Sequence, residues 1–426
     1  MSIEYSLPGI RVREHTVAVP LDWSDADSEP LVLFARELVA ADRRHDDLPL
    51  LLYLQGGPGF GSPRPLARTG WIGEALKTHR VVLLDQRGTG RSSRIEGRTL
   101  AARGDAVRQA DYLACFRADS IVADAEHLRS TVFDGRRWST LGQSYGGFVT
   151  LTYLSRAPEA LEACYVTGGL PALQPDAAEV YRRTYPRTVA KNAAFYARFP
   201  HHRETLARVA DRLAQGDVRL PDGDLLTVRR FQSLGIDFGM KPGFERLHYL
   251  LDDAFGIDGD LTDAFLGAVG DRTSFVAAPL FAALQESIYG AGEQATPWAA
   301  WAEHQRHPEA AEHARPLLMT GEMIYPWMFE EIRALRPFRA AVDVLAHRAE
   351  WPALYDLDRL AANDVPVAAA VYHDDMFVDA GLQLATAAHL GATRTWITNE
   401  FEHDGLETPR VLATLRELIE SDRTTC

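Results

Sequence analysis

The segment Gly142-Gln143-Ser144-Tyr145-Gly146 places a serine between two glycines, each two positions away. A short apolar run precedes it and an amphipathic stretch follows, so the serine lies on a strand–turn–helix. That turn exposes a hydroxyl at a helix N-terminus, where free N–H groups and the helix dipole favour negative charge. The alternative is a chance glycine-serine turn, but the flanking elements favour Ser144 as a nucleophile.

A nucleophilic serine needs a general base. In folds with this turn, the chain order is serine, then Asp or Glu, then histidine. Of the 14 histidines, His403 alone follows a final strand signal, in residues 392–405, after which only one helix remains. We therefore expect His403 to be the base, with a surface loop histidine as the alternative.

The acid that orients the base should follow the apolar run that ends near Val371. Asp375 is our choice, and Asp374 remains open as the alternative. Asp379 is expected to cap the next helix. A metal site at His373, Asp374 and Asp375 is not expected, because adjacent residues of an extended segment point in opposite directions.

Glycines dominate the loop after an earlier apolar run, in the sequence Gln55-Gly56-Gly57-Pro58-Gly59. In folds of this kind, one donor to the oxyanion is the N–H of the residue after the nucleophile, here Tyr145, and the other comes from such a loop. Gly56 and Gly57 both allow close approach of the backbone, and we favour Gly57 as the second donor.

Alternation of apolar runs with helical stretches predicts an α/β fold, with a mostly parallel central sheet flanked by helices. The chain divides into a first core half at 1–171, a largely helical insertion at 172–315 and a second core half at 316–426. Strand signals return after the insertion at 315–323, 365–375 and 392–405.

The chain has 426 residues and a net charge of −14, which argues against nucleic acid or an anionic membrane as partner. Three scattered cysteines, Cys115, Cys164 and Cys426, match no metal or redox spacing and suit a reducing compartment. We see no signal peptide and no run long enough to span a membrane, so we expect a soluble, cytoplasmic protein. The oligomeric state stays open.

Four ordered segments, QGGPG (55–59), DQRGTGRS (85–92), GQSYGG (142–147) and EHDG (402–405), together resemble the prolyl aminopeptidases, or proline iminopeptidases, of the α/β-hydrolase fold. The chain length and the segments GEMIYPWMF and NEFEHDG are similar to the longer bacterial form. The usual first motif begins with His, whereas this chain has Gln55.

The resemblance implies a serine peptidase that removes N-terminal proline from small peptides through an acyl-enzyme, without metal or cofactor. It implies Ser144 as nucleophile, Asp375 as acid and His403 as base. For Asp85 and Arg87, we favour a structural turn pinned by an ion pair.

An exopeptidase must also place the cationic amine of its substrate. The resemblance implies that acidic residues of the insertion bind this amine, as they do in the family. Glu286 in LQESIYG and Glu322 in TGEMIYPW lie near aromatic residues and are our candidates, with ordinary solvated acids as the alternative.

Two other functions remain open. One is a capped α/β-hydrolase of different specificity, either a broad aminopeptidase or an esterase, because the triad would be the same. The other is a non-catalytic binding protein on a hydrolase fold, although such proteins usually lose a triad member and all three positions are filled here.

Overall fold

The computed structural model describes residues 3–25, 27–174 and 176–423. At its centre is a nine-stranded sheet in the order β1-β2-β3-β5-β4-β6-β7-β8-β9. The strands are β1 (Glu4–Leu7), β2 (Ile10–Pro20), β3 (Pro30–Ala40), β4 (Leu50–Leu54), β5 (Arg80–Asp85), β6 (Trp138–Gln143), β7 (Leu161–Thr167), β8 (Val367–Tyr372) and β9 (Thr393–Thr398).

Strands β4 to β9 pair in parallel with one another, whereas β1, β2 and β3 pair antiparallel, and β3 is also antiparallel to β5. Strand β4 is apolar at every position because helices cover both of its faces. Leu51 and Tyr53 point to one side, and Leu50, Leu52 and Leu54 point to the other. The mostly parallel sheet flanked by helices, predicted from the sequence, is confirmed.

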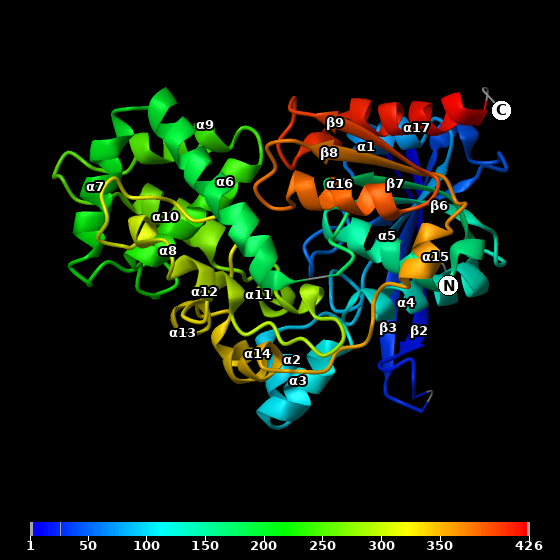
Figure 1. Ribbon diagram of the computed structural model, residues 1–426, viewed down its shortest axis with the longest axis horizontal. Coiled ribbons are helices and arrows are strands. Elements are labelled where there is room, and N and C mark those ends of the chain that lie inside the picture. The colour runs from blue at the N-terminus through cyan, green and yellow to red at the C-terminus, as the bar shows by residue number, and fades with distance from the viewer. Residues whose placement is uncertain (1–2, 26, 175, 424–426) are drawn as a thin grey trace.

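Helices α1 (Gly70–Ala75) and α17 (Pro409–Arg423) cover one face of the sheet (Figure 1). Helix α17 does so because its apolar residues recur with helical spacing, and Val411, Leu412 and Leu415 are buried. The opposite face and its lower end carry α2 (Gly97–Ala101), α3 (Ala106–Ala114), α4 (Ala118–Val132), α5 (Tyr145–Arg156), α15 (Leu357–Ala361) and α16 (Ala380–His389).

Most of the chain between β7 and β8, up to α14, is helical and forms a cap beside the sheet (Figure 1). Its helices are α6 (Ala177–Arg198), α7 (His202–Leu213), α8 (Val228–Gln232), α9 (Gly243–Asp252), α10 (Asp263–Thr273), α11 (Pro279–Leu284), α12 (Ala299–His304), α13 (Met328–Glu331) and α14 (Arg339–Ala346). Short 3-10 turns connect them, among them η3 (Ser233–Gly239) and η4 (Ser287–Tyr289). The domain bounds at 171 and 315 stay a prediction.

The strand expected at residues 315–323 was wrong. The side chain of Asn192 hydrogen-bonds to both backbone groups of Met319. Nδ2 of Asn192 donates to the Met319 carbonyl at 2.9 Å, and the Met319 N–H donates to Oδ1 of Asn192 at 2.7 Å. The N–H of Thr320 donates to the carbonyl of Gln232 at 2.8 Å. The segment is extended, but the cap satisfies its backbone without a neighbouring strand.

The cap has a hydrophobic core of its own, built around Phe195, Phe231 and Leu247. Met376 and Phe377 of the loop after β8 belong to the same core. This loop carries one of the predicted site residues, so the cap packs directly against the site.

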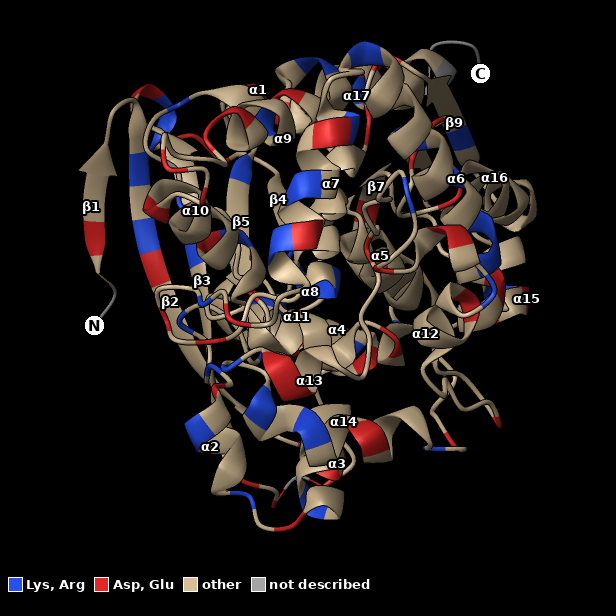
Figure 2. Ribbon diagram, turned by 90° about the vertical axis from the view of Figure 1, so that its left-hand side faces the viewer, with Lys and Arg blue, Asp and Glu red and all other residues tan. Residues whose placement is uncertain are grey.

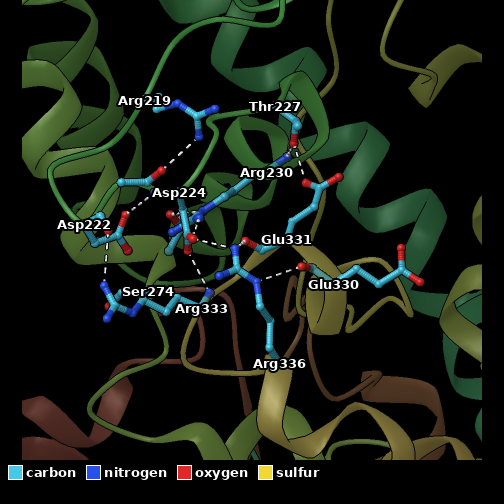
Figure 3. A network of polar contacts seen from close by, with 12 residues as sticks. Arg219, Asp222, Asp224, Thr227, Arg230, Ser274, Glu330, Glu331, Arg333 and Arg336 are labelled. Atoms are coloured by element: carbon cyan, nitrogen blue, oxygen red, sulfur yellow. Dashed lines mark hydrogen bonds and ion pairs between the residues drawn. The ribbon is translucent and has the colours of Figure 1, made fainter.

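A buried ionic network joins two cap segments around Asp224 (Figure 3). Its carboxylate accepts from the backbone N–H of Arg333 at 2.7 Å and pairs with Arg336 at 2.5 Å and Arg230 at 3.3 Å. Burial opposes the charged form, but the Arg333 N–H and the Arg336 guanidinium hold the pKa of Asp224 below its ordinary value. The network ties the loop before α8 to the segment after α13.

Strand β1 forms the outer edge of the sheet (Figure 2). It has only four residues, and Glu4 pairs with Arg11 at 3.1 Å and Arg13 at 2.7 Å on β2. Short, charged edges of this kind resist pairing with other chains. Within the described ranges, every helix is too short or too polar to cross a lipid bilayer.

Candidate active site

Ser144 occupies the turn between β6 and α5, with φ of 54° and ψ of −123°. A positive φ costs a residue other than glycine about 1–3 kcal/mol unless its surroundings hold it. Here the Ser144 N–H donates to the carbonyl of Thr167 at 2.9 Å, and its carbonyl accepts from the Gly147 N–H at 2.8 Å. The turn therefore presents the serine at the N-terminus of α5.

The positions of the glycines around Ser144 leave no room for a side chain. A Cβ at Gly146 would lie 1.9 Å from the carbonyl oxygen of Leu54, and one at Gly142 would lie 2.4 Å from that of Gly146. At Gly147, a Cβ would lie 2.2 Å from the oxygen of Gly169. Only glycine lets α5 start this close to the ends of β4 and β7.

Asp375 and His403 form a buried pair. Nδ1 of His403 lies 2.6 Å from Oδ2 of Asp375, and the two side chains are 5% and 0% exposed. The second oxygen of Asp375 accepts from the backbone N–H groups of Phe377 at 2.8 Å and Val378 at 3.1 Å. These bonds fix the carboxylate, which in turn fixes the ring of His403.

The loop of His403 is held by the cap. Its backbone N–H donates to the carbonyl of Gly239 at 2.8 Å, and its ring meets the Phe377 ring edge-on at 5.0 Å. Burial opposes the charged imidazolium, but the charge and hydrogen bond of Asp375 outweigh it and raise the pKa of His403. The ring is thus disposed to accept a proton.

The other two aspartates after β8 have different partners. Asp374 is exposed and contacts Nδ1 of its neighbour His373 at 2.8 Å. Asp379 accepts from the N–H of Leu382 at the start of α16 and pairs with Arg187 at 2.9 Å. Of the two acids left open by the sequence, Asp375 is the one that contacts His403.

Two consecutive glycines after β7 lie against Ser144 and His403, the predicted nucleophile and base. A Cβ at Gly168 would be 3.1 Å from Nδ1 of His403, and one at Gly169 would be 2.3 Å from the backbone oxygen of Ser144. The structure thus places Ser144, Asp375 and His403 after the carboxyl ends of the parallel strands β6, β8 and β9, the edge at which α/β sheets carry their sites.

The glycine loop after β4 approaches the serine closely. A Cβ at Gly56 would lie 2.9 Å from that of Ser144, and Gly57 has φ of 120°. Outside regular helices and strands, no described hydrogen bond uses the N–H groups of Gly57 or Tyr145 as donors. Both groups are therefore available to a ligand oxygen, and Gly56 has the closer contact with the serine.

The DQRGTGRS segment has a structural arrangement with two separate ion pairs. Asp85 is fully buried and pairs with Arg64 at 2.7 Å, while Arg87 pairs with Asp124 at 2.5 Å. A Cβ at Gly90 would lie 2.2 Å from the Asp85 carboxylate. The turn is pinned as we expected, but Asp85 and Arg87 each have a partner from another segment.

Glu322 lies near enough to Asp375 and His403 for their charges to affect its pKa. Burial raises the pKa of Glu322 to about 7; the charge of His403 opposes this and that of Asp375 adds to it. The residue is half-buried at a cavity of about 230 Å³, which is also lined by Phe60, Phe281 and Met328. A cationic group in this cavity would find a carboxylate close to the predicted triad.

Glu286 binds the N-terminus of α12, a structural role that the sequence did not predict. Its two oxygens accept from the N–H groups of Ala299 at 2.9 Å and Ala300 at 2.8 Å, at the start of α12. Burial raises the pKa of Glu286 to about 7, although both N–H groups oppose the shift.

Two further side chains belong to this region. Gln285 lies near enough to Glu322 to lower its pKa, and among the described residues no hydrogen-bond partner is found for its buried Oε1. Burial and the charges of Glu322, Glu286 and Asp375 raise the pKa of Tyr289. Our reading noted the aromatic residues near Glu286 but missed Gln285, because a glutamine beside a glutamate carries no signal of its own.

Comparisons with known proteins agree with this geometry. The sequence model of the alpha/beta hydrolase fold matches residues 49–406. A proline iminopeptidase of Aeromonas sobria is 49% identical over 95% of this chain and 95% of its own length. Proline iminopeptidase aneH of Aspergillus aculeatus is 33% identical over 93% of this chain and 91% of its own.

Proposed function

The chain belongs to the α/β-hydrolase family and, within it, to the prolyl aminopeptidases, and from this membership we propose that it releases N-terminal proline from short peptides. The observation that carries the proposal is that Glu322 lines a small cavity and lies near enough to Asp375 and His403 for their charges to affect its pKa. A triad alone would suit any serine hydrolase, whereas a carboxylate at this position suits a substrate whose first residue carries a free amine.

In the proposed reaction, the Ser144 hydroxyl attacks the carbonyl of the first residue, and Nε2 of His403 accepts its proton. Asp375 holds Nδ1 and stabilises the imidazolium. The N–H of Tyr145 and a backbone N–H of the Gly56–Gly57 loop donate to the oxyanion, where the loss of one donor typically costs about 100- to 1,000-fold in rate. His403 then protonates the leaving amine, and water hydrolyses the acyl-enzyme.

The cap supplies the preference for a free N-terminus. We assign Glu322 as the main partner of the substrate ammonium. Glu286 takes a secondary role, because two backbone N–H groups already use its oxygens. A pKa near 7 leaves Glu322 partly protonated until the ammonium arrives and favours its ionised form.

The cytoplasm remains our proposed location. Cys115 and Cys164 are free thiols, as suits a reducing compartment.

The test is hydrolysis of the arylamides of proline, alanine and leucine and of a simple ester, by wild type and Ser144→Ala. We expect a strong preference for proline and a loss of roughly a million-fold in the variant, as for other serine nucleophiles. Turnover of the ester without turnover of the proline arylamide would reject the peptidase function. Proline release that survives Ser144→Ala in a contamination-free preparation would reject the mechanism.

A further inference from the structure

Three histidines and an aspartate meet in the cap at the ends of two helices. His201 and His202 lie at the start of α7, and His248 and Asp252 lie in the last turns of α9. One ligand atom from each side chain lies within 4.8 Å of those of the other three. In Figure 1, α7 lies in the part of the cap farthest from the sheet.

The histidine nitrogens are turned toward one another. Nε2 of His202 lies 2.7 Å from Nδ1 of His248, and Nε2 of His248 lies 3.6 Å from Oδ2 of Asp252. The rings of His201 and His202 are 4.2 Å apart between centroids. A polar cluster of this kind is unusual at a junction between helices that otherwise pack through apolar residues.

Aromatic neighbours hold two of the rings in place. His248 stacks on Phe199 with centroids 4.3 Å apart and an interplanar angle of 7°. His202 lies parallel to Phe195 at 5.8 Å with an angle of 4°. Two of the imidazoles are therefore oriented before any ligand arrives, which lowers the entropic cost of binding one.

We propose that His201, His202, His248 and Asp252 bind one zinc ion. Three imidazole nitrogens and a carboxylate oxygen are a donor set that Zn²⁺ accepts in tetrahedral geometry. Bonds of about 2.0–2.1 Å place tetrahedral ligand atoms about 3.3 Å apart. One ligand atom from each of the four side chains lies within 4.8 Å of the others, so small side-chain rotations would bring the four donors to this separation.

The ion would act as a cross-link of the cap and not in the hydrolytic reaction. It would join α7 to the C-terminal end of α9, whereas the start of α9 lies next to the site. Gly239 precedes α9 by a few residues and accepts from the backbone N–H of His403, and Lys241 donates to the carbonyl of Glu400 at 2.7 Å. Zinc would therefore stabilise the cap against which the loop of His403 is held.

The experiment uses the full chain without a polyhistidine tag, because such a tag binds zinc itself. The protein is titrated with Zn²⁺ in a calorimeter, and its metal content is measured after dialysis. We expect one equivalent per chain and a rise in melting temperature. Asp252→Asn and His248→Gln should weaken binding by roughly 100-fold or more, because even loss of a residue that only supports a ligand costs 10- to 100-fold.

Asp343→Asn and His347→Gln are matched controls, because these residues form another His–Asp pair four positions apart, with exposed side chains 3.8 Å apart. Both should bind zinc as wild type does. The exposed His201 provides a further variant, His201→Ala, should a change at His248 disturb folding. Co²⁺ gives a second readout, since a tetrahedral site produces intense visible bands that the ligand variants should lose.

Binding below one equivalent, or binding that the Asp252 and His201 variants leave unchanged, would overturn the proposal. The kcat/KM for proline arylamide should change little in these variants. The zinc site and the proposed peptidase activity can therefore fail independently.

Discussion

One carboxylate oxygen of Asp375 lies 2.6 Å from Nδ1 of His403. The other oxygen accepts hydrogen bonds from two backbone N–H groups of the same loop. This arrangement leaves Nε2 of His403 as the nitrogen free for proton transfer. It also makes the neighbouring Asp374, which points to solvent, a natural control.

Asp375→Asn should lower kcat by about 10⁴-fold, as in other serine triads, because the amide no longer holds the reactive tautomer of histidine. Asp374→Asn should stay within a factor of about two of wild type. Steady-state kinetics on proline arylamide, with circular dichroism to verify folding, compares the two variants. Equal losses in both would show that the triad acid has been misassigned.

The kcat/KM for proline arylamide should rise as the pH increases through neutrality. The pKa of His403 is raised, so the base becomes neutral only at higher pH, and the pKa of Glu322 is about 7, so its anion also accumulates in this range. Both effects lower kcat/KM as the pH falls. In Glu322→Gln, the limb in kcat due to His403 should remain, whereas the dependence of KM near pH 7 should disappear. A KM profile unchanged in the variant would contradict the role of Glu322.

Glu322→Gln should lower kcat/KM for proline arylamide by about 10- to 150-fold, the equivalent of one charge-assisted hydrogen bond of roughly 1.5–3 kcal/mol. Its melting temperature should change little, because the side chain lines a cavity. Glu286→Gln should instead reduce stability by about 1–3 kcal/mol, since its amide would face the N–H of Ala299 or Ala300. If both variants keep wild-type kcat/KM, the assignment of the amine-binding acids is wrong.

Gly146→Ala should destabilise the protein by more than the 1–3 kcal/mol typical of overpacking, because the new methyl group would meet the carbonyl of Leu54 at 1.9 Å. Gly267→Ala in α10 is the control, because a Cβ there meets nothing within 4 Å. That change should be neutral or stabilise by up to about 1 kcal/mol. Urea unfolding measures both, and a Gly146→Ala protein of normal stability would contradict the close packing of the turn.

Asp224→Ala should cost about 3–5 kcal/mol, because it leaves the buried Arg230 and the Arg333 N–H without a carboxylate. Asp211→Ala, which removes an exposed partner of Arg315, should cost about 0–1 kcal/mol.

The Asp224 network should also make the wild type sensitive to acid. The pKa of Asp224 is lowered in the folded state, so its contribution is complete above the unfolded value and is lost as the pH falls through the folded one. Urea unfolding at neutral and acidic pH should show a smaller stability difference between wild type and Asp224→Ala in acid. A difference that does not shrink would exclude the ionised carboxylate as its source.

The sequence by itself determined the features that depend on neighbouring residues. Buried apolar runs with intervening helices predicted the parallel sheet, and the glycines around Ser144 predicted a turn that only glycine permits. His403 was predicted to be the base because a loop after the last strand must lie at the same edge of the sheet. These signals are local, since strand, turn and helix preferences are encoded over a few consecutive residues.

Only the tertiary structure decided which side chains meet across the chain. Asp374 and Asp375 are adjacent in the sequence, yet one points to solvent and the other contacts His403. Glu286 and Glu322 were equivalent candidates until the fold placed the N-terminus of α12 against the first and brought the second near the charges of Asp375 and His403. Such contacts depend on long-range packing of the cap, for which no short stretch of sequence carries a signal.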